Sequence, residues 1–430
     1  MEIKRDYYLN QLISSKGNGM IKVITGIRRC GKSYLLNNLF YNYLLQNNVD
    51  SDHIIKFSFD SAEDLKMIGE DPFKFSDPNA KVDPNKFMHY MKLKFNDSKT
   101  YYLLLDEIQL LGAFEFVLNS YLRHSNIEVY VTGSNAKFLS KDIITEFAGR
   151  GWQIHIFPLS FKEYYDAIGG DKLQLLQQYM LYGGLPALIN FSDKDKISYL
   201  KNLYKETYIK DVINRNKIVD EAPMEALLNT VSSSVGCLTN PSKLERAFKS
   251  IGNITLSAPT ISKYLELLCD AFIINVAKRY DIKGKMYMST PFKYYFTDLG
   301  LRNASIDFRQ VEYTHLLENL IYIELLRRGY SVDVGNIEKQ ETINGKYTRS
   351  QLEVDFVCNL GDKRLYIQVA YSIPDEAKIA QEKKSLLTIK DNFKKIIITM
   401  DYLQHLHYNN DGILIMNIYD FLFDENSIEY

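Results

Sequence analysis

The stretch TGIRRCGKSYLL, residues 25–36, decides the fold of the first part of this chain. It contains the spacing Gly-x-x-x-x-Gly-Lys-Ser, from Gly26 to Ser33. The β-branched run IKVIT precedes it, and SYLLNNLFYNYLLQN follows it with apolar residues at helical spacing. A strand, a glycine-rich turn and a helix in this order are the context in which the spacing forms a phosphate-binding loop. The alternative is a glycine turn that binds nothing.

Each residue type in such a loop has its own physical task. Gly26 and Gly31 let backbone N–H groups turn toward phosphate oxygens, and the start of the helix adds its positive end. Lys32 reaches the β- and γ-phosphates, and the Ser33 hydroxyl binds Mg²⁺. We therefore predict that ATP with Mg²⁺ binds at nine consecutive residues: Gly26, Ile27, Arg28, Arg29, Cys30, Gly31, Lys32, Ser33 and Tyr34.

A second acidic element is expected if the loop is real, and TYYLLLDEIQLL at 100–111 supplies it. Asp106 is placed to hold Mg²⁺ through water, and Glu107 to polarise the attacking water. Any buried strand that ends in a solvated turn has this appearance. The acidic pair therefore takes its weight from the loop upstream.

Two further candidates follow along the chain. IEVYVTGSN at 127–135 ends in Ser134 and Asn135, either of which is placed to contact the γ-phosphate, because the carboxyl ends of parallel strands face the ligand crevice. A turn that caps a helix is the alternative. Arg150 is predicted to stabilise the transferred phosphoryl charge, in its own chain or from a neighbouring subunit, with a plain surface arginine as the alternative. The predicted catalytic residues are Glu107, Lys32, Asn135 and Arg150.

Short apolar runs alternate with helical patterns in this part of the chain, which indicates a parallel sheet with right-handed crossovers. The predicted fold class is α/β, with a P-loop ATPase domain first. The expected strands are 21–25, 54–59, 101–105, 127–132 and 152–157.

Several segments, taken in order, resemble a known family. They are GIRRCGKSYLL, LLLDEIQ, VTGSNAKFLS, AGRGWQIHIFPLSFKEY and YGGLPALI. The family is that of prokaryotic ATPases that join an AAA-type ATP-binding domain to a C-terminal domain of unknown function. The resemblance implies a nucleotide loop at Gly26, Gly31, Lys32 and Ser33, a second acidic motif at Asp106 and Glu107, and a sensor at Asn135 or Ser134. Arg28 and Arg29 also resemble the family, without a physical derivation of their role.

The middle of the chain has the pattern of a winged helix. NPSKLERAFKS and SAPTISKYLELLCDAFII are predicted helices, with Ser257 as the cap and Pro259 early in the second, and INVAKRYDIKGKMYMS is a strand, a basic turn and a strand. Residues 243–293 hold nine Lys or Arg against four Asp or Glu. This excess indicates DNA contact. A protein-interaction module and a solvated basic face are the alternatives.

The last third resembles the restriction-endonuclease-like fold in its order of helix, three strands, helix and strand. Glu318, Asp355 and Gln368 match the signature of that fold, and Glu353 shares a strand face with Asp355. The signature expects a lysine where Ala370 stands, and Lys383 or Lys384 on the following helix is the substitute to consider. We predict a degenerate nuclease site, no metal-dependent cleavage of DNA, and a domain that is kept to bind a protein partner.

Length and composition limit the class of protein. A chain of 430 residues favours two or three domains, predicted at 1–195, 196–300 and 301–430. The formal net charge of -1 gives no overall attraction to nucleic acid, so such a surface has to be local. Four scattered cysteines suit a reducing cytoplasm, and no apolar run approaches the ~18 residues of a membrane span. We expect a cytoplasmic protein without a membrane anchor.

Together these patterns predict an Mg²⁺-dependent ATPase whose nucleotide state switches the conformation of a winged helix and a nuclease-like domain. One alternative is a protein-interaction module that nucleotide stabilises without hydrolysis. A second alternative is an ATP-gated nuclease. The oligomeric state is left open.

Overall fold

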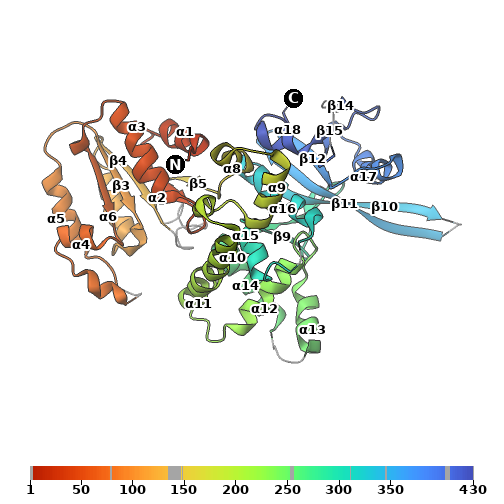
Figure 1. The fold of residues 1–430 in the computed structure, drawn as a ribbon, viewed down its shortest axis with the longest axis horizontal. Helices are drawn as coiled ribbons and strands as arrows, with labels where there is room; N and C mark the ends of the chain where they lie inside the picture. The colour runs from red at the N-terminus through yellow and green to blue at the C-terminus, as the bar shows by residue number, and fades with distance from the viewer. Residues whose placement is uncertain are drawn as a thin grey trace. The chain divides into compact units, whose positions relative to one another are not determined.

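The computed structural model describes residues 3–77, 80–133, 147, 149–251, 256–309, 311–343, 346–401 and 407–429. The chain forms two compact units, Met1–Pro158 and Leu159–Tyr430 (Figure 1). The passage between them lies well before the predicted boundary at 195, because the helices that follow Leu159 pack on later elements of the second unit.

The first unit is built on a five-stranded, fully parallel sheet in the order β2-β3-β4-β1-β5. All five predicted strands are confirmed, with ends shifted by two residues at most. The three inner strands, β1, β3 and β4, are buried along almost their whole length, as in sheets that helices cover on both faces, whereas Lys56 of β2 and Gln153 of β5 are exposed at the two edges. The strands are β1 (Ile21–Thr25), β2 (Ile54–Ser58), β3 (Tyr101–Asp106), β4 (Ile127–Thr132) and β5 (Gly151–His155).

Helices connect these strands. The predicted helix after the loop is one continuous helical run from Lys32 to Gln46, and α1 packs beside it. The helical segments are α1 (Asp6–Ser14), α2 (Lys32–Tyr34), η1 (Leu35–Phe40), α3 (Tyr41–Gln46), η2 (Ser51–His53), α4 (Ala62–Met67), η3 (Pro72–Ser76), α5 (Pro84–Lys94), η4 (Ile108–Leu110) and α6 (Phe114–Tyr121).

The second unit begins with a helical region. Ser257 caps α14 as predicted, since its side chain accepts a hydrogen bond from the Thr260 N–H at 3.3 Å. The helical segments are α8 (Phe161–Ile168), α9 (Lys172–Tyr182), η6 (Pro186–Asn190), α10 (Asp193–Asn202), η7 (Leu203–Ile209), α11 (Lys210–Arg215), α12 (Ala222–Ser233), α13 (Pro241–Ile251), α14 (Ala258–Asp270), α15 (Leu299–Ser305), α16 (Tyr313–Arg327), α17 (Glu376–Thr388) and α18 (Ile418–Phe423).

A mixed eight-stranded sheet forms the other part of this unit, in the order β14-β15-β13-β12-β11-β10-β7-β8. Figure 1 shows β10 and β11 as a long two-stranded ribbon. A separate pair joins β6 to β9. The strands are β6 (Ile274–Ala277), β7 (Arg279–Asp281), β8 (Met286–Tyr287), β9 (Lys293–Phe296), β10 (Ser331–Ile343), β11 (Lys346–Leu360), β12 (Lys363–Ala370), β13 (Lys394–Thr399), β14 (His407–Tyr408) and β15 (Leu414–Asn417).

The sheet corrects the predicted wing and the predicted boundary at 300. The hairpin of β7 and β8 exists, but β7 pairs in parallel with β10 through Arg279↔Val334. The hairpin is therefore the edge of the C-terminal sheet and not a free wing. The backbone of β7 pairs with a strand whose matching residue, Val334, lies 55 positions after Arg279, and local sequence patterns do not reveal such a pairing.

Gly183, which ends α9, allows a close contact with Asp298, the residue that caps α15. The Asp298 carboxylate caps α15, accepting from Leu301 N–H at 3.1 Å, and also accepts from Gly184 N–H at 2.8 Å. Gly183 has φ of 77°, and a Cβ there would lie 2.2 Å from an Asp298 oxygen. Burial raises the pKa of Asp298 to about 6, against the backbone hydrogen bonds that lower it. The YGG sequence thus makes room for a buried carboxylate.

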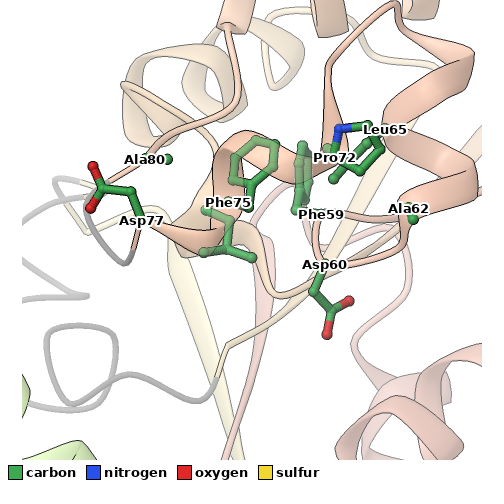
Figure 2. Close-up of a pocket in the computed structure, with 9 residues that line it drawn as sticks. Phe59, Asp60, Ala62, Leu65, Pro72, Phe75, Asp77 and Ala80 are labelled. Carbon is green, nitrogen blue, oxygen red and sulfur yellow. The ribbon is translucent and has the colours of Figure 1, made fainter.

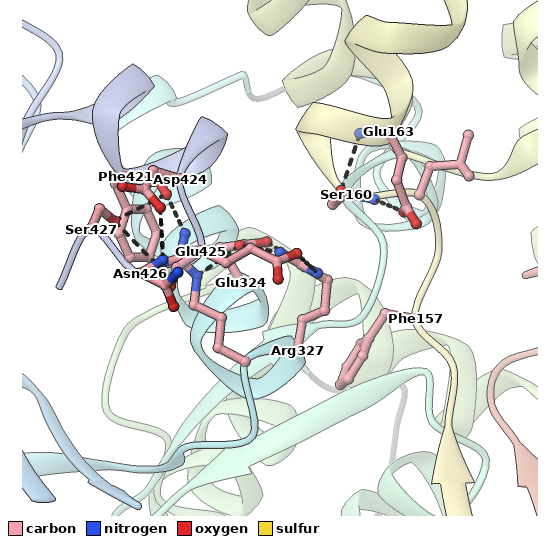
Figure 3. Close-up of polar contacts among 12 residues, drawn as sticks. Phe157, Ser160, Glu163, Glu324, Arg327, Phe421, Asp424, Glu425, Asn426 and Ser427 are labelled. Carbon is pink, nitrogen blue, oxygen red and sulfur yellow. Dashed lines mark hydrogen bonds and ion pairs between the residues drawn. The ribbon is translucent and has the colours of Figure 1, made fainter. Parts of the chain in front are cut away.

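A buried ion pair within α16 joins Arg327 to Glu324, and Arg327 also reaches the end of the chain through Glu425, whose side chain is 43% exposed (Figure 3). The Arg327 guanidinium donates to both oxygens of Glu324, at 2.7 and 2.8 Å, and to Glu425 at 3.0 Å. Burial alone raises the pKa of Glu324, but the Arg327 and Arg328 guanidinium groups outweigh it, and the pKa is lowered overall. Such pairs are costly to break, because removing one partner leaves an uncompensated buried charge.

The first and last helices of the second unit are in contact. The ring of Phe423 on α18 lies 5.6 Å from that of Phe161 and 5.1 Å from that of Tyr165, both on α8. A capping box of Ser160 and Glu163 starts α8 (Figure 3). The unit therefore closes on itself through an aromatic cluster.

Candidate functional site

The predicted loop lies where the sequence places it, between the carboxyl end of β1 and α2. Gly26 and Gly31 have φ of 146° and 103°, and a Cβ on Gly26 would lie 2.2 Å from the Ile156 carbonyl oxygen. Only glycine fits such a position. The Lys32 ammonium is buried and donates to the carbonyl oxygens of Gly26 and Ile27, each at 3.0 Å. The loop is thus curled around its own lysine.

Asp106, at the end of β3, faces this loop. Burial raises the pKa of its carboxyl group, while hydrogen bonds from Thr132 and Ser33 oppose that rise. Asn37 Nδ2 lies 3.4 Å from its second oxygen. The structure therefore brings the predicted Mg²⁺ residues Ser33 and Asp106 together. A buried carboxylate beside a hydroxyl is a donor set that Mg²⁺ accepts.

Glu107 has a backbone conformation that is rare for its residue type. Its φ and ψ are 52° and 45°, and its N–H donates to the Thr132 hydroxyl at 3.2 Å. Its carboxylate accepts a hydrogen bond from Gln109. Left-handed conformations of residues other than glycine cost about 1–3 kcal/mol and cluster at functional sites. This strain supports the predicted role of Glu107.

Sequence analysis missed three side chains of this site: Thr132, Asn37 and His155. The order of the sheet holds the signal for Thr132, because β4 lies beside β3 and both end at the same edge. His155 Nδ1 lies 3.1 Å from Thr25 Oγ1, at the end of β1. Burial, and then the nearby Lys32 charge, lowers the pKa of His155 to about 4. The His155 imidazole is therefore neutral beside the loop, and no sequence motif predicts a histidine at this position.

The remaining predicted residues have different outcomes. Ser134 and Asn135 lie outside the described residues, so their sensor role stays a prediction. Arg28 is half-buried and Arg29 is exposed. Arg150 precedes β5, and its carbonyl accepts from the N–H of Ile21 at the start of β1. The loop follows the other end of β1, roughly 16 Å away for five residues of strand. Arg150 therefore lies at the end of the strands opposite to the loop, where it cannot complete the site of its own chain.

A cavity of about 250 Å³ opens near the carboxyl end of β2 (Figure 2). Its lining is mainly apolar and includes two carboxylates, so it does not suit a phosphate group. No residue of the predicted nucleotide loop lines it. The lining residues are Phe59, Asp60, Ala62, Leu65, Pro72, Phe75, Asp77, Ala80 and Leu110.

In the second unit, three of the predicted nuclease-like residues gather around an unpredicted lysine. The Lys293 ammonium, on β9, lies 3.0 Å from Glu318 Oε1 and 2.7 Å from Glu353 Oε1. Asp355 accepts from Val369 N–H at 2.8 Å and is close enough to sense the charges of Lys293 and Glu318. A lysine therefore does stand beside these carboxylates, although Ala370 occupies the position at which the signature expects one and neither suggested substitute is Lys293. Lys293 comes from a strand more than 60 positions before Asp355, where the signature does not look.

Gln368 is not brought into this cluster by any contact among the described residues. Its side-chain oxygen accepts from Ser385 on α17 at 3.3 Å, and Ala370 packs in the apolar core with Leu386. Lys383 pairs with Asp411 at 3.1 Å instead of replacing the missing lysine. Within the described part of the chain, no three His, Cys, Asp or Glu side chains are placed to hold a metal ion.

The charges of this cluster predict a pH dependence. Burial, and then the Glu318 charge, raises the pKa of Asp355 to about 8, from 3.8. Between these values the folded chain holds a proton that the unfolded chain has lost, so stability falls as pH rises from about 4 to 8. We expect Asp355→Asn to flatten that fall, which amounts to at most about 1.4 kcal/mol per pH unit, and to be more stable than the parent at pH 8. Urea unfolding at pH 5 to 8, followed by circular dichroism, measures this.

Asp362→Asn is the matched control, because this carboxylate is exposed in the turn between β11 and β12. It should keep the pH profile of the parent. A parent profile that is flat from pH 5 to 8 would contradict a buried, protonated Asp355. Trp152, the single tryptophan, reports on the first unit and separates its unfolding from that of the second.

Within the described residues, none of the helices combines the length and apolar character needed to cross a bilayer. Residues 18–165 match a family described as an AAA domain, and residues 173–312 match a domain of unknown function. Among solved structures, the Walker-type ATPase of Pyrococcus abyssi aligns with a TM-score of 0.46 and 15% identity, covering 71% of this chain and 96% of that chain.

Two curated relatives span nearly the whole chain. An uncharacterized protein of Methanocaldococcus jannaschii is 28% identical over 431 residues, which cover 95% of this chain and 86% of that protein. An uncharacterized protein of Haemophilus influenzae is 36% identical over 426 residues, which cover 98% of this chain and 98% of that protein. The chain therefore belongs to the family of the Haemophilus influenzae protein, and it carries an AAA-type P-loop domain followed by a domain of unknown function.

Proposed function

We propose that this protein binds MgATP at the loop Gly26–Ser33 and hydrolyses it slowly. The observation that carries the proposal is the meeting of Asp106 with Ser33, between the loop and the end of β3. Ser33 and Asp106 would hold Mg²⁺, which supplies charge stabilisation for the transferring phosphoryl group. Lys32 leaves the carbonyls of Gly26 and Ile27 to contact the β- and γ-phosphates.

Glu107 is the proposed base that polarises the attacking water. Its strained backbone, and the hydrogen bonds from its N–H to Thr132 and from Gln109 to its carboxylate, support the role by fixing its direction. Thr132 contacts both Asp106 and Glu107, so one hydroxyl orients the two acidic residues. Asn135 as sensor, and Arg150 donated by a neighbouring subunit, remain parts of the proposal that rest on sequence.

The second unit is the proposed responder to nucleotide state. We keep the nuclease-like fold for it as a hypothesis, with Lys293 paired to Glu318 and Glu353 in a site that binds a protein partner and does not cut DNA. DNA is the alternative partner. Arg279 and Lys293 of the basic segment 243–293 are buried, which leaves seven exposed cations there: Lys243, Arg246, Lys249, Lys263, Lys278, Lys283 and Lys285. Phosphate release measured with and without duplex DNA tests that alternative.

MgATP is expected to raise the thermal stability of the parent chain, because a ligand that binds only the folded state stabilises it by mass action. At a hundred times its Kd the gain is about 2.7 kcal/mol, or roughly 5–10 °C in Tm. Lys32→Ala should remove most of this shift, since the phosphates lose their ammonium partner. Differential scanning fluorimetry with millimolar MgATP measures the effect.

Lys92→Ala is the matched control, because Lys92 is exposed on α5 of the same unit. It should keep the full shift. An unchanged melting curve of the parent in millimolar MgATP would contradict the proposed function. A parent that binds MgATP but releases no phosphate would favour the alternative in which nucleotide only stabilises the fold.

A further inference from the structure

Arg5 contacts the phosphate loop from behind. This residue precedes α1, and its side chain is buried, with 3% exposed. Its Nη1 donates to the Cys30 carbonyl oxygen at 3.0 Å, and its Nη2 donates to the Phe157 carbonyl oxygen at 2.7 Å. The guanidinium carbon also lies 4.8 Å from the centre of the Tyr8 ring. One guanidinium therefore joins the loop to the segment that follows β5.

The contact with Cys30 fixes the direction of a loop amide. In a trans peptide the C=O and the following N–H lie in one plane and point in opposite directions. Holding the Cys30 carbonyl toward Arg5 therefore holds the Gly31 N–H away from Arg5. Gly31 has φ of 103° and lies directly before Lys32, where loops of this spacing turn N–H groups toward phosphate. A rotated peptide would present a carbonyl oxygen to the phosphates, which repels them.

The contact with Phe157 holds the guanidinium in place. Phe157 N–H donates to the Tyr8 hydroxyl at 3.1 Å, so Arg5 and Tyr8 together hold both polar backbone groups of Phe157. A buried cation is expensive unless its N–H groups are paired, and hydrogen bonds to a charged group are stronger than neutral ones. Because the Arg5 guanidinium contacts the Cys30 carbonyl of the loop, its positive charge also favours a polyanionic ligand in the loop.

We infer that Arg5 is a positioning residue of the nucleotide site, which orients the Gly31 N–H for phosphate by holding the Cys30 carbonyl. The inference rests on the proposed function, because it assigns a task in nucleotide binding. The loop holds phosphate alike before and during the reaction, so losing Arg5 weakens binding more than it slows chemistry.

The test compares three variants with the parent: Arg5→Met, Arg5→Lys and Tyr8→Phe. Tyr8→Phe loosens α1 at Phe157 without touching the loop, so it is the matched control. With a fluorescent ATP analogue and Mg²⁺, Arg5→Met should raise Kd about tenfold or more, the order expected for one hydrogen bond to a charged group. Arg5→Lys, which keeps the charge, should lose less, and Tyr8→Phe should stay within about twofold. The KM for ATP should rise in Arg5→Met with kcat within about threefold of the parent.

Hydrogen exchange without nucleotide supplies a second measurement. Amides of residues 26–34 should exchange faster in Arg5→Met and Arg5→Lys than in the parent, while amides of β3 and β4 keep their protection. This result does not depend on whether the chain hydrolyses ATP, and Arg5→Lys serves if Arg5→Met fails to fold.

The outcomes separate the two ideas. If the parent binds MgATP but the Arg5 variants bind within twofold of it and exchange is unchanged, the role of Arg5 is overturned and the proposed function stands. Equal losses in Tyr8→Phe and Arg5→Lys also overturn it, because they indicate general loosening of α1. If the parent binds no nucleotide, the proposed function fails, and the assignment of Arg5 to nucleotide binding fails with it.

Discussion

Glu107→Gln is expected to lower ATP turnover about a hundredfold or more, while nucleotide still binds. The amide keeps the size of the carboxylate and can still accept the hydrogen bond from Gln109, but it cannot draw a proton from water. The backbone at Glu107 is held by Thr132, so the substitution should leave the local fold in place. Phosphate release with saturating MgATP measures turnover, and binding of a fluorescent ATP analogue shows that the site is intact.

Glu63→Gln makes the same chemical change at an exposed position on α4 of the same unit and should turn over like the parent. Hydrolysis at the parental rate by Glu107→Gln would remove Glu107 as the base. In that case the water must be oriented by another group. Loss of binding together with turnover would instead assign Glu107 a structural task beside Asp106.

Gly183→Ala should destabilise the second unit by several kcal/mol, among the larger effects that a single methyl group can have. The new Cβ would lie 2.2 Å from an Asp298 oxygen, and that carboxylate is held by the N–H groups of Gly184 and Leu301. Moving it away leaves buried N–H groups without acceptors, at about 1–3 kcal/mol each. Chemical unfolding followed by circular dichroism measures the loss.

Gly169→Ala is the control that separates the contact with Asp298 from the backbone strain as the cause of the lost stability. Gly169 ends α8 as Gly183 ends α9, with a similar φ of 69°, but a Cβ there would meet nothing within 4 Å. This variant has only the strain of the left-handed backbone, about 1–3 kcal/mol. If the two variants lose the same stability, the contact with Asp298 costs nothing and our account of the YGG sequence is incorrect.

The first unit was largely predictable from sequence because its signals are local. Most of the parallel strands are short apolar runs, and the loop pattern requires a strand before it and a helix after it. Sheet order is a different kind of information. It places Thr132 on Asp106 and puts Arg150 at the far end of β1, and neither fact follows from the spacing of residues along the chain.

The second unit shows the limit of motif reasoning. Several of its helices and strands were predicted, but β9 and β15 were not. In addition, β7 pairs with β10, and Lys293 on β9 meets Glu318 and Glu353, across long stretches of sequence. A signature that expects its lysine two positions after Gln368 cannot find one on another strand. The burial of Lys293 becomes understandable only when the carboxylates that surround it in the folded chain are known. Burial alone lowers the pKa of Lys293, yet those carboxylates raise it overall.

The contact between α8 and α18 bears on how the chain is made. Phe161 and Phe423 must meet before the second unit is complete, whereas the sheet of the first unit ends at His155. A growing chain can therefore finish its first unit while the rest is still being synthesised, and the second unit must wait for nearly all of its residues. At ordinary rates of synthesis that interval is roughly 15 to 50 seconds. During it Phe161 can already pack on Tyr179 of α9, but Phe161 and Tyr165 both lack the ring of Phe423, so part of the aromatic surface of α8 stays uncovered until the end of the chain is made.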